Sequence, residues 1–199
     1  MIVITIDQRA SRRRPDLVDD LVARLNERYA PLRRFERTAG DELQGVLDDG
    51  VAAVELALDV AGTGEWSVGI GVGSVKRPLP EQTRAGSGEA FELAREAVER
   101  AKHSPASLAV AGPGSEAKRL EAELQLVAEV NLRRTQASEE AGRLIASGLS
   151  QREAGERLGI TQQAVSGRLA SGLWHQSRGL AAQAAGAMAA YSEATDGDS

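Results

Sequence analysis

Hydrophobic and polar positions follow two different spacings in the first 111 residues. Short apolar runs predict five strands, at residues 1–6, 32–38, 43–47, 66–75 and 108–111. Apolar positions three and four residues apart predict helices that begin at Pro15, Val51 and Glu89. The first six of these elements follow the order β-α-β-β-α-β, which is typical of a ferredoxin-like domain.

Two groups of glycines refine this prediction. The strand expected at 66–75, WSVGIGVGSV, has alternating glycines, which indicates that a helix or another backbone segment approaches it closely. Gly40-Asp41 separates the strands expected at 32–38 and 43–47. This pair is a hairpin signal, although its order is the reverse of the most favourable one.

The second half of the chain is predicted to be helical. Gly112-Pro113-Gly114 interrupts the strand pattern. Helical spacing then follows at 115–134 and 138–147, and an alanine-rich helix is expected at 179–191. The final residues, TDGDS, are expected to be disordered.

Residues 149–174, LSQREAGERLGITQQAVSGRLASGLW, carry the signals of a helix-turn-helix. Ser150 followed three residues later by Glu153 is a capping box, so a helix is expected directly after Ser150. Gly159 suits the left-handed turn that commonly ends a helix, and Thr161 can cap the next helix. The turn is then three or four residues long, as the motif requires.

One side of this helix pair is predicted to be buried and the other to read DNA. The apolar positions that would form the buried side are Leu149, Ala154, Leu158, Ile160, Val165 and Leu169. Gln can pair with adenine through two hydrogen bonds, and Arg with guanine. The predicted DNA-binding residues are Arg152, Thr161, Gln162, Gln163, Ser166 and Arg168. The run ITQQAVS also resembles the recognition helices of lambdoid phage repressors and of sigma-factor region 4. The alternative is a helical hairpin that serves only for packing.

Composition narrows the classes of site. The chain has no cysteine, which excludes disulfides and thiol chemistry, and its two histidines are far apart in the sequence. We expect no signal peptide and no membrane span, and therefore a cytoplasmic protein. The net charge of −5 argues against a general nucleic-acid binder but not against a sequence-specific one. Because few arginines lie near the motif, we expect a homodimer.

Two acidic side chains are expected at one edge of the N-terminal sheet. Asp7 ends the first strand and Asp41 lies in the hairpin, and these two strands are neighbours in a ferredoxin-like sheet. Two carboxylates can bind a divalent metal and, through it, the phosphates of a nucleotide. Glu42 could assist, and Arg9 and Arg12 could hold anionic oxygens. The alternative is that Asp7 caps the next helix or pairs with the arginines, and that Asp41 only forms part of a turn.

The segments ITIDQRASR, FERTAGDELQGVL, WSVGIGVGSV and GSGEAFELAREAVERAK together resemble the SatD family of bacterial proteins, over residues 1–110. The region is also similar, more remotely, to class III nucleotidyl cyclases and GGDEF diguanylate cyclases. Those families place one metal-binding aspartate at the end of the first strand and another acidic position in the hairpin, and these match Asp7 and Asp41. The chain has Ala39-Gly40 where diguanylate cyclases have two consecutive glycines. We predict no catalytic residue, and nucleotide sensing and structural pairing of two subunits both stay open.

The predicted fold class is α/β (α+β), with a ferredoxin-like βαββαβ domain followed by an all-α helix-turn-helix domain. The expected units are residues 1–114, a connector or dimerisation helix at 115–137, the DNA-binding domain at 138–192 and a disordered tail at 193–199. The predicted function is a bacterial transcription regulator that binds double-stranded DNA as a homodimer, with a candidate nucleotide ligand. The alternatives are a metal-dependent nucleotidyl cyclase or transferase, and a module that binds a protein such as RNA polymerase.

Overall fold

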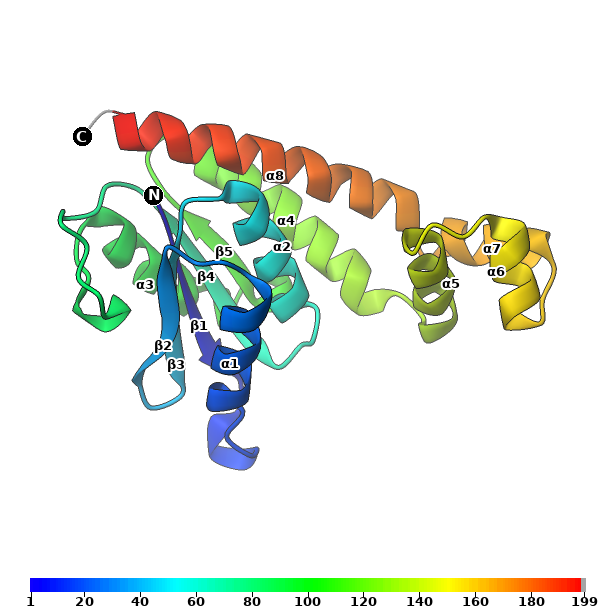
Figure 1. The fold of residues 1–199 in the computed structure, drawn as a ribbon, viewed down its shortest axis with the longest axis horizontal. Coiled ribbons are helices and arrows are strands. Elements are labelled where there is room, and N and C mark those ends of the chain that lie inside the picture. Colours follow the sequence, from blue (N-terminus) through cyan, green and yellow to red (C-terminus); the bar gives the residue numbers. More distant parts are fainter. Residues whose placement is uncertain (198–199) are drawn as a thin grey trace.

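A five-stranded sheet lies beside a long helical arm in the computed structural model, which describes residues 1–197 (Figure 1). The mixed α/β class predicted from the sequence is confirmed. The strands and α-helices of the described residues are β1 (Ile2–Gln8), α1 (Val18–Arg28), β2 (Arg33–Ala39), β3 (Glu42–Leu47), α2 (Gly50–Ala61), β4 (Trp66–Val72), α3 (Glu89–Ala101), β5 (Leu108–Ala111), α4 (Glu116–Arg133), α5 (Gln136–Ala146), α6 (Gln151–Leu158), α7 (Gln162–Ser171) and α8 (Trp174–Gly197).

Strand β1 is the central strand of the sheet, whose order is β2-β3-β1-β4-β5. It pairs antiparallel with β3 on one side and with β4 on the other, and β5 runs parallel to β4. The even-numbered residues Ile2, Ile4 and Ile6 pack into the main core with α1, α2, α4 and α8. Val3 faces the opposite side, where it packs with Ala90, Phe91 and Ala94 of α3. Burial on both faces explains why the first residues of β1, Ile2–Ile4, are all apolar.

The alternating glycines of β4 lie directly beneath α3. A Cβ atom at Gly69 would overlap the backbone of Ala94 and Val98, and one at Gly71 would overlap the backbone of Ala90 and Ala94. The close approach predicted from the sequence is therefore confirmed. It brings the C-terminal end of α3 to the edge of the sheet where β1 ends.

The sequence predicts that the first helix begins at Pro15. In the structure α1 begins three residues later, at Val18. The amide of Gln8, a buried residue, holds the chain outside a helix at this point. Its nitrogen donates to the carbonyl of Pro15 at 2.6 Å, and its oxygen accepts from the backbone N–H of Leu17 at 3.0 Å. Strand β4 is also shorter than expected and ends at Val72, because Ser74 already accepts a hydrogen bond from Ala90 at the start of α3.

Helix α8 is much longer than the helix expected at 179–191. It begins at Trp174 beside α7 and runs back along α2 and α4 (Figure 1). Its residues Ala184, Ala185 and Met188 belong to the main core. The sequence predicts a separate domain at 138–192. Helix α8 begins in that region but packs into the main core.

The expected disordered tail at 193–199 is helical as far as Gly197, and residues 198–199 lie outside the described part of the chain. Contacts with other parts of the chain hold the end of α8 in place, among them an ion pair of Arg77 with Asp196 at 3.3 Å. The Tyr191 hydroxyl donates to the carbonyl of Pro113 at 2.6 Å, and the Asp196 carboxylate lies 3.6 Å from the N-terminal ammonium group. Within residues 1–197, no helix is long and apolar enough to cross a membrane.

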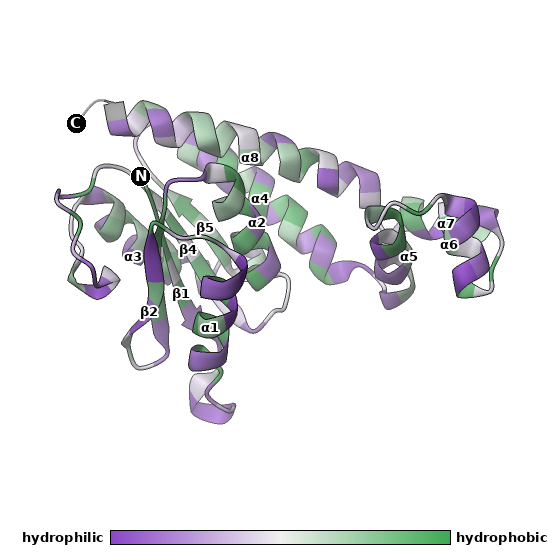
Figure 2. Ribbon diagram, viewed as in Figure 1, coloured by the Kyte–Doolittle hydropathy of each residue, from purple (hydrophilic) through white to green (hydrophobic). Residues whose placement is uncertain are grey.

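Helices α5, α6 and α7 form a small unit with its own core at the far end of the arm (Figure 1). Its buried residues are Ala141, Ala154, Val165, Leu169 and Trp174. Figure 2 shows many hydrophilic residues in α6 and α7, whereas β4 and β5 of the sheet are mainly hydrophobic. We call residues 134–178 the helical unit.

Candidate functional site

The start of α6, its end and the start of α7 follow the sequence signals. The Ser150 hydroxyl accepts a hydrogen bond from the Glu153 N–H at 3.3 Å, and the Glu153 carboxylate accepts from the Ser150 N–H at 2.8 Å. Gly159 ends α6 in the left-handed conformation, with φ of 67°. The Thr161 hydroxyl then caps α7 by accepting from the Ala164 N–H at 3.1 Å. The capping box, the left-handed turn and the second cap are thus confirmed.

Small residues let α6 and α7 approach each other. Ala154 is fully buried, and the backbone of Ile160 lies close to Gly155, where a Cβ atom would come within 2.8 Å of the Ile160 carbonyl oxygen. Val165 and Leu169 fill the space between α7 and the other two helices. Packing therefore determines which face of α7 is buried, and the opposite face is exposed to solvent.

The predicted DNA-binding residues lie mostly on this free face. Gln162, Gln163 and Ser166 of α7 are exposed, whereas Arg168 is half-buried. Thr161 is exposed at the start of α7, and Arg152 is exposed on α6. Helix α7 contains no acidic residue. The structure therefore leaves the three polar side chains at the start of α7 free to contact another molecule.

Charge is unevenly distributed along the chain. The helical unit has six arginines and four acidic residues, which gives it a net charge of +2. Because the whole chain has a net charge of −5, the remaining residues have a net charge of −7. An acidic protein can therefore still present a helical unit that attracts a polyanion, because interactions between exposed charges fall off within about 10 Å at 0.1 M salt.

Arg134 and Trp174 hold the helical unit onto the arm, and the sequence did not single them out. The Arg134 side chain is only 4% exposed and its guanidinium group lies 4.8 Å from the Trp174 ring centre. It donates to the carbonyl of Gly172 at 2.9 Å and to the Ser177 hydroxyl at 2.7 Å, and it pairs with Glu139 at 3.0 Å. One side chain thus joins the start of α5 to the junction of α7 and α8.

Replacing Ser150 by alanine is expected to lower the free energy of unfolding of the helical unit by about 1 kcal/mol, because the Glu153 N–H loses its acceptor at the helix start. Urea denaturation followed by circular dichroism would measure the loss. Ser147→Ala is the matched control, since the Ser147 hydroxyl only donates to a carbonyl near the end of α5. Equal effects of the two substitutions would contradict the prediction.

The same pair gives an expected pH dependence. Hydrogen bonds from Ser150 lower the pKa of Glu153 below its ordinary value of 4.5. A lowered pKa in the folded state stabilises the fold above the ordinary pKa, and this contribution is lost as the pH falls through the folded value. The stability difference between the wild type and Ser150→Ala is therefore expected to shrink below pH 4.5. A constant difference down to the acid transition would contradict this.

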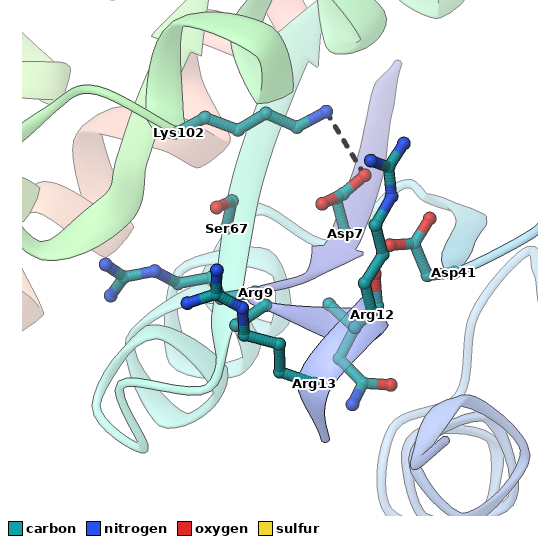
Figure 3. Close-up of a pocket in the computed structure, with 10 residues that line it drawn as sticks. Asp7, Arg9, Arg12, Arg13, Asp41, Ser67 and Lys102 are labelled. Carbon is teal, nitrogen blue, oxygen red and sulfur yellow. Dashed lines mark ion pairs between the residues drawn. The ribbon is translucent and has the colours of Figure 1, made fainter. Parts of the chain in front are cut away.

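A second candidate site is an open cleft of about 580 Å³ at the end of β1 (Figure 3). Asp7, Asp41, Arg9 and Arg12 all line it, so four of the five residues predicted for a metal or nucleotide lie together. Glu42 is opposite Asp7 in the register, but its carboxylate accepts a hydrogen bond from Thr38 at 2.6 Å and it does not line the cleft.

Asp7 is paired with a lysine that the sequence had not indicated. The Lys102 ammonium group, just beyond the end of α3, lies 3.2 Å from the Asp7 carboxylate. Burial raises the pKa of Asp7, against the opposing effect of Lys102, and the negative charge of Asp41 adds to the rise. Burial would lower the pKa of Lys102, but its hydrogen bonds to Glu99 and Asp7 raise it. Asp7 is therefore not free. Its ion pair is with Lys102 and not with an arginine, which was one alternative that the sequence left open.

The cleft also contains Arg13 and Ser67, which the sequence analysis did not single out. Ser67 is opposite Asp7 in the antiparallel register of β1 and β4, so the two side chains lie on the same face of the sheet. A usable signal was present, because Ser67 continues the row of Gly69 and Gly71 along β4. No group of three or more His, Cys, Asp or Glu residues that could hold a metal ion occurs in the described chain.

The described residues define a mixed α/β protein with a basic cleft at one end of the sheet and a three-helix unit at the far end of the arm. In comparisons with known proteins, the chain matches no protein-family model, no curated protein and no solved structure. The functional argument therefore depends on the geometry of these two sites.

Proposed function

We propose that this chain is a transcription regulator that binds double-stranded DNA through a helix-turn-helix formed by α6 and α7. The exposed first turn of α7 carries the proposal. Gln162, Gln163 and Ser166 face solvent there, while Val165 and Leu169 anchor the opposite side of the same helix. Such a row of hydrogen-bonding side chains, on a packed helix that has no acidic residue of its own, fits the edges of bases.

The dimensions of the helix pair support this proposal. Helix α7 has 10 residues, which correspond to a length of about 15 Å. An α-helix with its side chains is about 10–12 Å across, and the major groove of B-DNA, which is about 12 Å wide, admits it. Only three residues, 159–161, separate α6 from α7, as in helix-turn-helix proteins.

We assign the contacts by side-chain chemistry. Gln162, Gln163 and Ser166 would contact base edges in the major groove, and Arg168 would contact a base or a phosphate. Thr161 and Arg152 would contact the DNA backbone, which positions the helix but carries no sequence information. Because Arg168 is half-buried, we expect it to reach only groups close to α7.

A homodimer acting in the cytoplasm, on the nucleoid, is part of the proposal. A single helical unit offers few cations, so two copies would be needed for tight binding at physiological salt. A two-fold dimer would recognise inverted half-sites about one turn of DNA apart, or a multiple of it.

We also propose that residues 1–111 form a ferredoxin-like unit with an added strand. The sheet order β2-β3-β1-β4 and its antiparallel pairs support this, and β5 extends the edge beside β4. The likeness to the SatD family stays a prediction. The pairing of Asp7 with Lys102 gives no support to the alternative of a metal-dependent cyclase.

Gln163→Ala is expected to weaken binding to the preferred DNA site by about 1–3 kcal/mol and to relax the sequence preference at one position, because a bidentate contact is lost. Selection of genomic fragments with the full chain would supply the site, and a gel-shift assay would measure the affinity. A triple variant with Gln162, Gln163 and Arg168 replaced by alanine should lose sequence-specific binding.

Gln183→Ala is the matched control, since Gln183 is an exposed glutamine of α8 that lies outside the helix pair. It should bind the selected DNA like the wild type. If no sequence is enriched, or if the triple variant binds as well as the control, the DNA-binding proposal is wrong. A protein complex that forms without any DNA shift would instead favour a protein-binding module.

A further inference from the structure

The cleft at the end of β1 has more positive than negative side chains. Four cationic groups line it, those of Arg9, Arg12, Arg13 and Lys102, against the two carboxylates of Asp7 and Asp41. The side chains of the cleft therefore sum to +2 near neutral pH. Such an excess favours an anion over a metal ion, because a cation would meet net repulsion.

The two carboxylates are poorly placed to hold a metal ion. Asp7 already accepts the Lys102 ammonium group at 3.2 Å, so a metal would have to displace a bound cation. Asp41 is the only other acidic residue that lines the cleft among the described residues. Divalent ions of the Ca²⁺ type take six to eight oxygen ligands, which this pair does not approach.

Ser67 supplies an observation that is independent of charge. It is 1% exposed, and its hydroxyl is one of two buried side-chain groups in the described residues that have an atom without a hydrogen-bond partner. It lines the cleft beneath Lys102 and beside Asp7 (Figure 3). Buried hydroxyl groups are normally hydrogen-bonded, so an unpaired one at the floor of a cleft indicates a missing partner.

Two of the cationic groups are free for such a partner. Among the residues that the structure describes, the side chains of Arg12 and Arg13 make no hydrogen bond or ion pair, whereas Arg9 donates to the carbonyl of Gly64 at 3.3 Å. In Figure 3 the Arg12 guanidinium group lies on the side of the two aspartates, and that of Arg13 lies on the side of Ser67. Guanidinium groups suit the paired oxygens of phosphate, which two parallel hydrogen bonds can hold.

We propose that this cleft binds the dianion of a phosphate group, without a metal ion, through Arg12, Arg13, Lys102 and the Ser67 hydroxyl. The charge of the ligand balances the +2 of the cleft, and its oxygens give the Ser67 hydroxyl the acceptor that it lacks. The phosphate is either free or part of a small ester. The proposal is independent of DNA binding by α7, which lies at the other end of the molecule (Figure 1).

The test is isothermal titration calorimetry of the full chain with inorganic phosphate and, separately, with adenosine monophosphate, both in a buffer that contains a metal chelator. We expect saturable binding of one equivalent. Arg12→Gln and Lys102→Gln should each weaken it about tenfold, because each removes one charge-assisted hydrogen bond. Ser67→Ala should weaken it severalfold. Tighter binding of the monophosphate identifies an ester as the ligand, and equal affinity identifies the free ion.

Arg14→Gln is the matched control, since Arg14 is an exposed arginine of the same segment that does not line the cleft. It should bind phosphate like the wild type, and the melting temperature of each variant would show that it is folded. Absence of saturation at millimolar phosphate would overturn the proposal. So would an equal loss in Arg14→Gln, or Mn²⁺ binding that Asp7→Asn abolishes. None of these outcomes bears on the gel-shift result.

Discussion

Replacing Trp174 by alanine is expected to lower the free energy of unfolding of the helical unit by about 3–5 kcal/mol. The Trp174 side chain is the largest in the small core, and it is only 5% exposed. It lies against Gly142 of α5, where a Cβ atom would overlap the ring, and beneath the guanidinium groups of Arg134 and Arg178. Its removal would leave a cavity and also take away the ring against which the buried guanidinium group of Arg134 packs.

The second tryptophan allows unfolding of the sheet to be measured separately from unfolding of the helical unit. Trp66 is buried in the main core, so in the Trp174→Ala variant its fluorescence reports on the sheet alone. Urea denaturation followed by circular dichroism should show early loss of helix, while the Trp66 transition changes little. Leu173→Ala is the matched control, because Leu173 is adjacent and 45% exposed, and it should change stability by less than about 0.5 kcal/mol. Coincident early unfolding of both regions would contradict the prediction.

Gly69→Val is expected to destabilise the sheet by about 3 kcal/mol or more, at the upper end of the range for overpacked cores. The new side chain would meet the backbone of Ala94 and Val98 in α3, which cannot move aside as a flexible side chain can. Helix α3 would have to lift from β4, and Lys102 would move away from Asp7. The variant should therefore also lose phosphate binding at the cleft.

Thermal unfolding monitored by circular dichroism would measure this effect. Gly186→Ala provides the control, since Gly186 is an exposed position within α8 where an added Cβ atom would meet no other atom within 4 Å. There alanine should stabilise the helix by about 0.5–1 kcal/mol, because it has the higher helix propensity. A melting temperature for Gly69→Val equal to that of the wild type would show that α3 does not depend on this close approach.

Local signals explain which parts of the fold were predictable. The capping box at Ser150 and Glu153, the turn at Gly159 and the cap at Thr161 each depend on neighbours within a few residues. The start of α1 was wrong because it depends on Gln8, whose amide holds the chain at 15–17 from a distance in sequence. The length of α8 was not predicted for a similar reason. Its alanine-rich sequence has no strong alternation of apolar and polar positions, and the helix extends along α2 and α4.

The candidate sites divide in the same way. Asp7, Asp41, Arg9 and Arg12 could be chosen from the sequence because they lie within or next to β1 and its neighbouring hairpin. Lys102 could not, because the end of α3 reaches Asp7 only through its close packing on the glycines of β4. That one contact pairs Asp7 with a cation and brings a fourth positive side chain to the cleft.

By itself the sequence determined the order of the strands and helices, though not where α1 begins or how far α8 extends, together with the turn between α6 and α7 and the polar face at the start of α7. Hydrogen bonds within a few residues and the alternation of apolar and polar positions are sufficient for these. Only the tertiary structure decided that the Arg134 guanidinium group packs on the Trp174 ring and that Lys102 forms an ion pair with Asp7. It also decided that α8 contributes to the main core and to the core of the helical unit. These depend on contacts between residues far apart in the chain, where packing and charge act through space and leave no local pattern.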